Sequence, residues 1–410
     1  MNSPARRVAE VAGAFLKLGL TSFGGPIAHL GYFHREFVER RRWIDDAHFA
    51  RLLALCQFLP GPASSQLGFA LGLLRAGWAG AMVAFLAFTL PSALLLFAFA
   101  SASEHLSGPW GSAVIHGLKL LAVAVVAQAV LSMARTLTPD RPRILMALLA
   151  AALVLTWDGA WVQVLLVLGG ALVGAKLLKS ASAAQGEVFE LPYGRRTGAS
   201  LLLAFAALFV LTPLMAAQTG SQGLALFDAF YRSGALVFGG GHVVLPLLQE
   251  TVVAPGWLDE GSFLAGYGAA QAVPGPMFAV AAFLGERVTG DAGGATGAAV
   301  ALLAIFLPGL LLVAGALPFW RSLAAKPRAA RMMAGANAVV VGLLAAALYD
   351  PVWTGTIRRQ VDVLVVLAAF ALLAKARLSV VAVGASCIVA ALAVAAYTAG
   401  VGGLATPSLP

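Results

Sequence analysis

The chain has 410 residues, of which 60% are hydrophobic and only 11% are charged, and its formal net charge is +9. Soluble globular domains carry about a quarter charged residues, so this composition excludes an ordinary soluble enzyme and indicates a protein of the lipid bilayer. In a membrane protein a positive balance reflects basic cytoplasmic loops, so it does not point to nucleic acid as a partner.

Thirteen apolar segments follow one another along the chain, which predicts an all-α polytopic membrane protein. Nine are close to the length that crosses the hydrocarbon as a helix, about 20 residues. These expected crossings are 77–103, 112–134, 144–157, 160–175, 198–217, 295–320, 332–349, 361–374 and 378–399. The other four are interrupted by Gly and Pro, and they are 8–33, 47–74, 223–248 and 261–285.

The interrupted segments carry one pattern twice. The pattern consists of G-x-x-x-F-G-G, then W-I-D-D or W-L-D-E, then Q-x-x-P-G-P. Its blocks begin at Gly19, Trp43 and Gln57 in the first half and at Gly234, Trp257 and Gln271 in the second. The matching blocks are 215, 214 and 214 residues apart. We therefore expect a first repeat at 1–178, a cytoplasmic linker at 179–197 and a second repeat at 198–410, with 198–217 as an added helix.

Loop charges predict that the repeats have opposite orientations. The stretch 34–46 is rich in arginine, whereas the matching stretch 249–260 contains no Lys or Arg. Basic loops stay in the cytoplasm, so equivalent loops lie on opposite sides, as in an inverted-topology repeat. We expect nine crossings and four re-entrant helical hairpins, with the N-terminus in the cytoplasm. The alternative is that all thirteen segments cross.

The four breaks are the expected binding site. Non-helical backbone at membrane depth is tolerated only inside protein or beside a wet cavity, and a helix that begins there turns free N–H groups toward an anion. The alternative is that Gly and Pro only allow close packing of the hairpin tips. The candidate substrate-binding residues of the first half are Ser22, Phe23, Gly24, Gly25, Pro26, Gln57, Pro60, Gly61, Pro62 and Ser64. Those of the second half are Phe238, Gly239, Gly240, Gly241, His242, Gln271, Pro274, Gly275 and Pro276.

Two cations occupy matching positions in the repeats. Lys17 and Arg232 each stand six residues before the Phe of F-G-G. Charged groups inside membrane segments are costly and are candidates for a functional role, which here is substrate binding, although both side chains could instead extend to the interface. His242 breaks the symmetry and is either a proton carrier or a hydrogen-bonded core residue.

Enzyme and metal functions find no support in the sequence. The chain has no H-E-x-x-H, G-x-S-x-G or G-x-x-x-x-G-K-[ST] motif, so we expect no catalytic residue, no metal, no other cofactor and no ATP-binding loop. The two cysteines, Cys56 and Cys387, lie among apolar neighbours and predict core positions.

Together, F-G-G-P, W-I-D-D and Q-F-L-P-G-P with F-G-G-G, W-L-D-E and Q-A-V-P-G-P closely resemble the long, two-domain type of the chromate ion transporter family. The resemblance runs from about residue 8 to 400. It implies a secondary transporter of the bacterial inner membrane that exports chromate, a tetrahedral dianion, and gives chromate resistance. Uptake of sulfate or another oxyanion and a passive anion channel are the alternatives. The coupling ion, proton or sulfate, and a homodimer stay open.

Overall fold

A computed structural model describes residues 3–402, apart from residues 104, 106–107, 158–159, 179–188, 190, 239–240, 321–325 and 377. The described part consists of helices and their connections, without strands. The first half contains α1 (Pro4–Thr21), α2 (Gly25–His34), η1 (Arg35–Arg40), α3 (Asp46–Phe58), α4 (Ala63–Ser103), α5 (Gly108–Leu137), α6 (Arg141–Thr156) and α7 (Ala160–Leu177). The predicted linker 179–197 lies largely outside the described residues.

The second half repeats this order after one added helix. It contains α8 (Arg195–Thr219), α9 (Gln222–Ala235), η2 (Gly241–Val243), α10 (Val244–Leu248), η3 (Gln249–Val253), α11 (Glu260–Ala272), η4 (Met277–Ala279), α12 (Val280–Arg287), α13 (Gly294–Ala316), η5 (Leu317–Phe319), α15 (Pro327–Ala347), η6 (Leu348–Trp353), α16 (Gln360–Ala374) and α17 (Val380–Gly402). Even the short π-helix recurs, as η1 after α2 and as η3 after α10.

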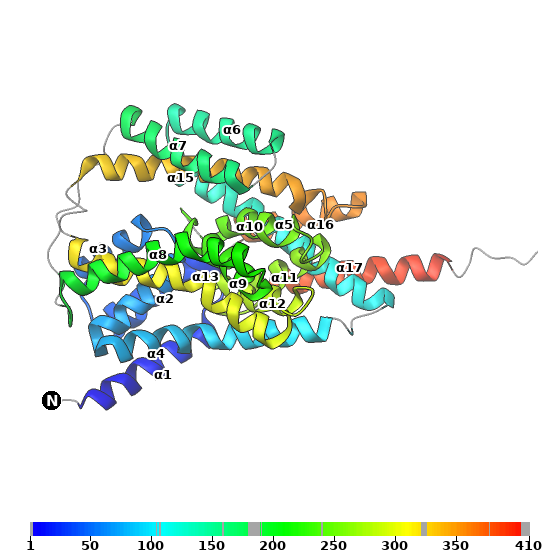
Figure 1. Cartoon of the computed structure of the whole chain (residues 1–410). Helices are drawn as coiled ribbons and strands as arrows, with labels where there is room; N and C mark the ends of the chain where they lie inside the picture. The colour runs from blue at the N-terminus through cyan, green and yellow to red at the C-terminus, as the bar shows by residue number, and fades with distance from the viewer. Residues whose placement is uncertain are drawn as a thin grey trace, which may run out of the picture.

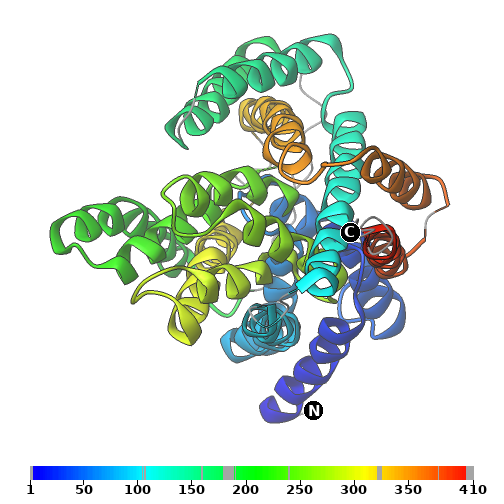
Figure 2. The ribbon, with the colours of Figure 1, turned by 90° about the vertical axis from the view of Figure 1, so that its right-hand side faces the viewer.

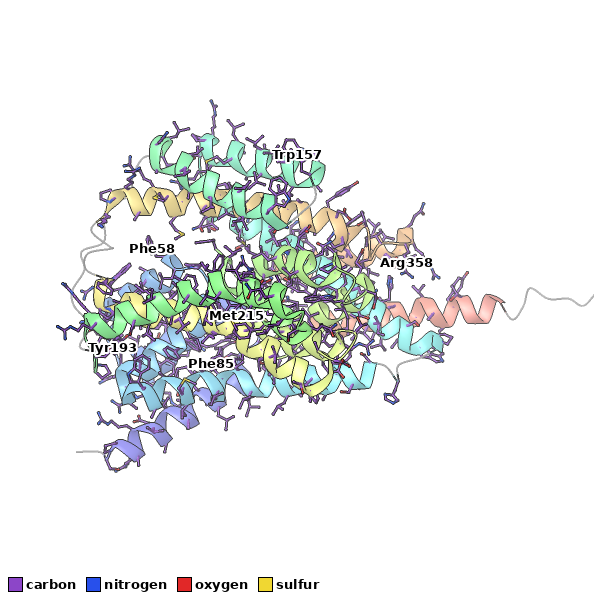
Figure 3. All side chains as sticks on the ribbon, in the orientation of Figure 1. Phe58, Phe85, Trp157, Tyr193, Met215 and Arg358 are labelled. Carbon is purple, nitrogen blue, oxygen red and sulfur yellow. The ribbon has the colours of Figure 1, made fainter. Side chains whose placement is uncertain are left out.

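Helix lengths and exposed side chains fit a protein that crosses the membrane several times. Among the described residues six helices are long and apolar enough to span it, namely α4, α5, α8, α13, α15 and α17, and α7 and α16 are shorter apolar helices. Large apolar side chains cover the outside of α6, α7 and α8; Leu203 is 70% exposed, and Trp157, labelled at the edge of the bundle in Figure 3, is 60% exposed. Such surfaces are stable against lipid but not against water.

The terminal helices of each half pack against a helix of the other half. α5 of the first half packs against α16 and α17 of the second, and α15 of the second half packs against α6 and α7 of the first. Figure 1 shows α6, α7 and α15 together along one edge, and Figure 2 shows the same bundle turned by 90°. Small residues allow these helices to approach closely, as membrane helix pairs require: a Cβ on Gly117 of α5 would lie 2.6 Å from Ile388 Cα of α17, and one on Gly335 of α15 would lie 2.8 Å from Gly174 Cα of α7.

Each interrupted segment is divided into two helices at its Gly and Pro motif. In the first half, α1 and α2 meet at F-G-G, and α3 and α4 meet at P-G-P. In the second half, the corresponding breaks lie between α9 and η2 and between α11 and η4. α4 has a further irregularity at Ala76 and Gly77, whose φ values are −142° and 66°, so it consists of a short arm and a long arm.

The ends of the broken segments gather at two places. At the first, Arg7, Arg42, His48 and Arg75 line one cavity, so the beginnings and ends of both first-half segments lie together. At the second, Gln222 Nε2 donates to the Thr289 carbonyl (2.9 Å), and Thr289 N–H donates to the Trp257 carbonyl (3.1 Å).

The long arm of α4 separates these two places. It begins at Trp78, just after Arg75, and near its far end Ser101 Oγ donates to Glu286 Oε1 (3.2 Å), three residues before Thr289. At 1.5 Å per residue the arm is about 35 Å long between Trp78 and Ser101. The two clusters of segment ends therefore lie at opposite ends of a helix that is long enough to cross a bilayer.

Candidate oxyanion site

Two glycine-containing turns break the first half. α1 ends at Thr21, and α2 begins at Gly25 after Gly24; the φ values of these glycines are 74° and 99°. α3 ends at Phe58, and α4 begins at Ala63 after Gly61, whose φ is 120°. L-residues rarely adopt positive φ, so the chain reverses at these points because glycine is there.

The second half repeats these turns. α9 ends at Ala235, and the chain resumes a helical conformation at Gly241; Gly239 and Gly240, predicted as site residues, lie outside the described residues. α11 ends at Ala272, and Gly275 has a φ of 103°. The glycine of P-G-P therefore has the same left-handed backbone in both halves.

Two hydrogen bonds join the breaks across the halves. Gly61 N–H donates to the Val237 carbonyl (2.7 Å), and Gly275 N–H donates to the Ser22 carbonyl (2.9 Å). Ser22 and Val237 are the residues directly before the Phe of F-G-G. Each P-G-P glycine is thus bonded to the F-G-G break of the other half, so the four breaks form two pairs, each of which crosses between the halves.

The P-G-P glycines also lie against helices of the opposite half. A Cβ on Gly61 would be 3.1 Å from Gly309 Cα of α13, and one on Gly275 would be 2.8 Å from Ser92 Oγ of α4. Gly309 and Ser92 each directly follow a proline inside their helix. These contacts leave no room for a side chain, so glycine is needed for space as well as for conformation.

Buried hydroxyl groups surround the first-half breaks. The side chains of Ser22, Ser64 and Ser65 are at least 97% buried. Ser22 Oγ and Ser65 Oγ have no hydrogen-bond partner among the described residues. Buried hydroxyls are normally bonded, so these two unpaired ones, Ser22 at the end of α1 and Ser65 in the first turn of α4, could bond a ligand. Gln66 lies beside them; its Nε2 donates to the carbonyls of Pro60 (2.9 Å) and Gly309 (3.2 Å).

His29 is a candidate site residue that the sequence analysis missed. It is fully buried on α2, with Nε2 3.1 Å from the Ser22 carbonyl oxygen and Nδ1 3.5 Å from Ser64 Oγ. Because a carbonyl only accepts, Nε2 must carry a proton, and Nδ1 of the neutral ring is left to accept from Ser64. His29 therefore joins the F-G-G break to the start of α4. The signal was available, since a histidine inside an apolar membrane segment is a functional candidate.

His242 belongs to the second-half break but faces the first. Its Nδ1 lies 2.9 Å from Tyr267 Oη on α11, and its Nε2 lies 3.9 Å from the position that a Cβ on Gly25 would take. A predicted site residue of one repeat thus lies next to a predicted site residue of the other.

The two matching glutamines have different environments. Gln57 is exposed, whereas Gln271 is buried and its Nε2 donates to Met277 Sδ (3.1 Å). Phe23 and Phe238 are half-buried, and Phe238 lines an apolar cavity of about 70 Å³. Pro60, Pro62, Pro274 and Pro276 lie in the turns on either side of their glycines. The side chain of Pro26 lies outside the described part.

Lys17 and Arg232 contact acidic side chains. Lys17 Nζ lies 3.7 Å from Glu36 Oε2, and its side chain is about half exposed. Arg232 Nε donates to both carboxylate oxygens of Asp228 (2.9 and 3.0 Å), and its guanidinium donates to the Phe209 carbonyl (2.9 Å) on α8. The hydrogen bonds and ion pairs of these cations go to Glu36, Asp228 and α8, and none goes to a break residue in the described structure.

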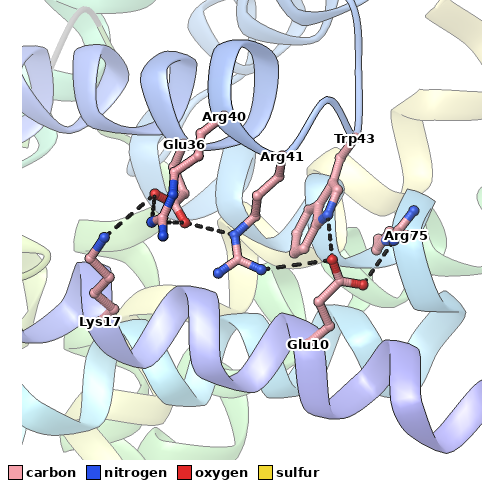
Figure 4. A network of polar contacts seen from close by, with 7 residues as sticks. All are labelled: Glu10, Lys17, Glu36, Arg40, Arg41, Trp43 and Arg75. Carbon is pink, nitrogen blue, oxygen red and sulfur yellow. Dashed lines mark hydrogen bonds and ion pairs between the residues drawn. The ribbon is translucent and has the colours of Figure 1, made fainter.

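Glu36 belongs to a larger network at the end of the first half, which Figure 4 shows. Arg41 Nε donates to Glu36 Oε1 (2.6 Å), and Arg40 donates to both Glu36 oxygens. Burial alone would raise the pKa of Glu36, but the hydrogen bonds from Arg41 and Arg40, together with the charge of Lys17, lower it. A second carboxylate, Glu10, accepts from Trp43 Nε1 (3.0 Å) and Arg75 (2.8 Å).

No group of three or more His, Cys, Asp or Glu side chains that could hold a metal ion occurs among the described residues. Cys56 and Cys387 are both buried and unbonded to each other. The polar groups around the breaks include hydroxyls, amides and imidazoles, all of which can donate hydrogen bonds to an anion.

Comparison with known proteins agrees with this chemistry. A family model described as chromate transporter matches residues 9–175 and 224–396. The chain is 32% identical to a probable chromate transport protein of Synechococcus elongatus, over 84% of each chain. It is 30% identical to a chromate transport protein of Pseudomonas aeruginosa, over 85% of this chain and 82% of the relative, and 29% identical to one of Cupriavidus metallidurans, over 84% and 83%. No solved structure matches the chain.

Proposed function

Because the chain belongs to the chromate transporter family, we propose that it is a secondary transporter that exports chromate across the bacterial inner membrane and thereby gives chromate resistance. The observation that carries the proposal is the pair of hydrogen bonds, Gly61 to Val237 and Gly275 to Ser22, that joins the four breaks in two pairs across the halves. They bring helix ends from both halves to one place, and such ends at membrane depth are where transporters bind anions.

The proposed binding site uses backbone and hydroxyl donors. α4 begins at Ala63, and the N–H groups of its first turn point away from the helix, as those of every helix start do. Ser22 Oγ and Ser65 Oγ add two buried donors that have no hydrogen-bond partner in the described part of the chain. A tetrahedral dianion offers several acceptor oxygens and gains from the positive end of the helix dipole. Lys17 and Arg232 enter the proposal as positive charges on the helices that lead to the two F-G-G breaks.

We further propose that the two halves, 1–178 and 198–410, are inverted repeats, with the broken segments re-entrant and the N-terminus cytoplasmic. The shared cavity of Arg7, Arg42, His48 and Arg75 supports hairpins, because it joins the beginnings and ends of both first-half segments. Thr289 follows the second-half broken segment 261–285 and lies near the end of α4 that is opposite to Arg75. The segment ends of the two halves therefore lie at opposite ends of α4, which supports inversion. A cysteine at Arg41 tests the topology, since modification by an impermeant thiol reagent from the periplasm would contradict it.

The charge of the substrate favours export over uptake. Moving one elementary charge across 100 mV is worth about 2.3 kcal/mol, so an inside-negative potential of that size drives a dianion outward by about 4.6 kcal/mol. Uptake of sulfate would have to overcome the same term through coupling ions. Rocking of one half against the other would expose the site alternately to the two sides.

Transport by inside-out vesicles tests the proposal. Vesicles with the chain should accumulate radiolabelled chromate when the interior is made positive, and unlabelled chromate loaded inside should accelerate entry of label. Acceleration of this kind occurs in carriers and not in channels. Sulfate accumulation without chromate accumulation would favour the alternative substrate, and no accumulation of chromate above vesicles that lack the chain would refute the proposal.

Two serine variants test the site itself. Ser22→Ala and Ser65→Ala each remove an unpartnered hydroxyl and should raise the KM for chromate roughly tenfold, as the loss of one charge-assisted hydrogen bond does. Ser200→Ala is the matched control, because Ser200 is exposed on α8 and bonds only the Thr197 carbonyl among the described residues. Equal KM values in all three variants would remove the serines from the site.

A further inference from the structure

The cavity at the place where the first-half broken segments begin and end is lined by three arginines and by none of the break residues. Its volume is about 780 Å³. It is bounded by the start of α1, the turn before α3, the short arm of α4 and one residue of the linker between the halves. The lining residues are Arg7, Val38, Arg42, Trp43, Ile44, Asp45, Asp46, His48, Leu71, Leu74, Arg75 and Phe189. Three arginines from three different elements thus face one space.

The backbone at Arg42 is strained. Its φ of 52° is the only positive value at a non-glycine residue in the described chain. Neighbouring hydrogen bonds hold this turn on both sides, from Arg41 N–H to the Glu36 carbonyl (2.9 Å) and from Trp43 N–H to the Phe37 carbonyl (2.8 Å). A left-handed conformation is unfavourable for any residue with a Cβ.

The matching turn of the second half has a glycine at the left-handed position. Gly256 precedes Trp257 as Arg42 precedes Trp43, and its φ is 75°. The same backbone is therefore built without strain by glycine in one repeat and with strain by arginine in the other. Glycine at position 42 would relax the backbone, so the presence of a strained arginine there points to a role for the Arg42 side chain.

The arginine charges of the cavity are only partly neutralised. Arg75 bonds Glu10 (2.8 Å), and its guanidinium lies 5.2 Å from the centroid of the Trp43 ring. Arg7 and Arg42, by contrast, form no side-chain hydrogen bond or ion pair with any described residue. Among the residues that the structure describes, the cavity therefore keeps two guanidinium groups without an anionic partner.

The acidic residues of the cavity do not supply that partner. Asp45 Oδ1 accepts from His48 N–H (2.8 Å), and Asp45 also bonds the His48 ring; the backbone bond is the main reason that the pKa of Asp45 is lowered. Asp46 lies 2.6 Å from His34 Nε2 and thereby raises the pKa of His34. Both carboxylates are engaged with histidines.

We propose that this cavity binds tetrahedral oxyanion dianions from solution and supplies them to the site at the breaks, an inference that rests on the proposed transport function. The paired N–H groups of a guanidinium can each donate a hydrogen bond to a different oxygen of such an anion. The cavity is much larger than one oxyanion, so the ligand keeps part of its hydration and exchanges quickly. A basic cavity of this kind raises the local concentration of the substrate, which lowers KM and leaves the maximal rate unchanged.

Arg42→Gly separates recruitment from folding. Glycine relieves the strain, so the melting temperature should be no lower than that of the wild type, whereas the KM for chromate in inside-out vesicles should rise roughly three- to tenfold at low ionic strength. The difference from the wild type should shrink in high salt, because screening weakens the cavity's field. Arg42→Lys should be intermediate. Arg35→Ala is the matched control, because Arg35 is an exposed arginine of η1 that does not line the cavity.

Arginine footprinting tests binding without relying on transport. The protein in nanodiscs of zwitterionic lipid is treated with phenylglyoxal, and modification of its arginines is measured by peptide mass spectrometry. Chromate or sulfate, but not chloride at equal ionic strength, should slow the modification of Arg42. Arg35 should react equally in the presence of each of the three anions. Protection of Arg42 by anionic lipid instead of by these dianions would overturn the proposal. Transport-active protein with unprotected Arg42 and an unchanged KM in Arg42→Gly would also overturn it, while leaving the transport function intact. Protection in a protein that moves no chromate would support the anion site and refute the proposed function.

Discussion

The P-G-P turn of the second half offers the sharpest test of the joined breaks, through Gly275→Ala. Alanine at a φ of 103° costs about 1–2 kcal/mol for the left-handed backbone. Its Cβ would lie 2.8 Å from Ser92 Oγ and 3.3 Å from the Phe88 carbonyl oxygen, and such overpacking costs about 1–3 kcal/mol more. The expected total is about 2–5 kcal/mol, and the hydrogen bond to Ser22 should be weakened with it.

The chain carries its own reporters for this measurement. Cys56 and Cys387 are buried, so a thiol-reactive dye labels them as the protein unfolds. The melting temperature of Gly275→Ala in detergent should fall by about 5 °C or more. Adding Ser92→Ala should recover part of the loss, because it removes the 2.8 Å contact with Oγ but leaves the contact with Cβ (3.1 Å) and the backbone strain. Gly13→Ala is the control, since nothing lies within 4 Å of its Cβ position. If Gly275→Ala melts like Gly13→Ala, the geometry described for this break is wrong.

Three further changes test other contacts. Glu36→Gln should abolish an acid-dependent loss of stability. Burial would raise the pKa of Glu36, but hydrogen bonds from arginines outweigh it and lower the pKa below its ordinary 4.5. The stabilisation by Glu36 is therefore present above pH 4.5 and lost as the pH falls through the folded-state pKa, which thermal melts at several pH values can measure. His29→Ala should cost about 1–3 kcal/mol and lower the transport rate, because it removes the donor to the Ser22 carbonyl; unchanged vesicle uptake would contradict its place in the site. Gly234→Ala should destabilise by about 1–3 kcal/mol in the dye assay, since its Cβ would overlap a carbonyl of α13, and a neutral result would contradict that helix contact.

Local chemistry made much of the helical organisation predictable. Long apolar runs can satisfy their backbone in lipid only as helices, and each of the nine segments expected to cross is helical in the structure apart from one or two residues at an end, such as Trp157 after α6 and 378–379 before α17. The four breaks were equally readable, because glycine at positive φ and proline without an N–H interrupt helices in any context. What the sequence did not reveal is that α5 and α15 pack against the terminal helices of the opposite half, since small residues permit close approach without specifying the partner.

The sequence predicted those features of the candidate site that depend on local backbone conformation. It did not predict those that depend on which side chains or segments meet in the folded protein. Gly61 and Gly275 have the expected irregular backbone, but their bonds to the opposite half depend on tertiary contacts. Arg232 could have been recognised as an anchor, because Asp228 stands four residues earlier on the same helix, the spacing of a helical ion pair. The pair of Lys17 with Glu36, nineteen residues later, follows from no such rule.

The difference between the repeats bears on the direction of transport. Both halves have a left-handed residue directly before the tryptophan that they share, yet the first half has Arg42 and Arg75 where the second has Gly256 and Thr289. A dianion that approaches the first-half end therefore meets guanidinium groups that the matching positions of the second half lack. The same positive field that concentrates a dianion at this end would oppose its departure there, whereas the second-half end has no such field at the matching positions. Capture at the end with these arginines and release at the end without them is the order that export requires, since the proposed topology puts the arginines in the cytoplasm. Exchanging the two residues, as Arg42→Gly with Gly256→Arg, should accordingly raise the KM for export measured in inside-out vesicles and lower that for entry measured in right-side-out vesicles. Equal KM values for the exchanged and the native chain on both sides would show that the asymmetry plays no part in direction.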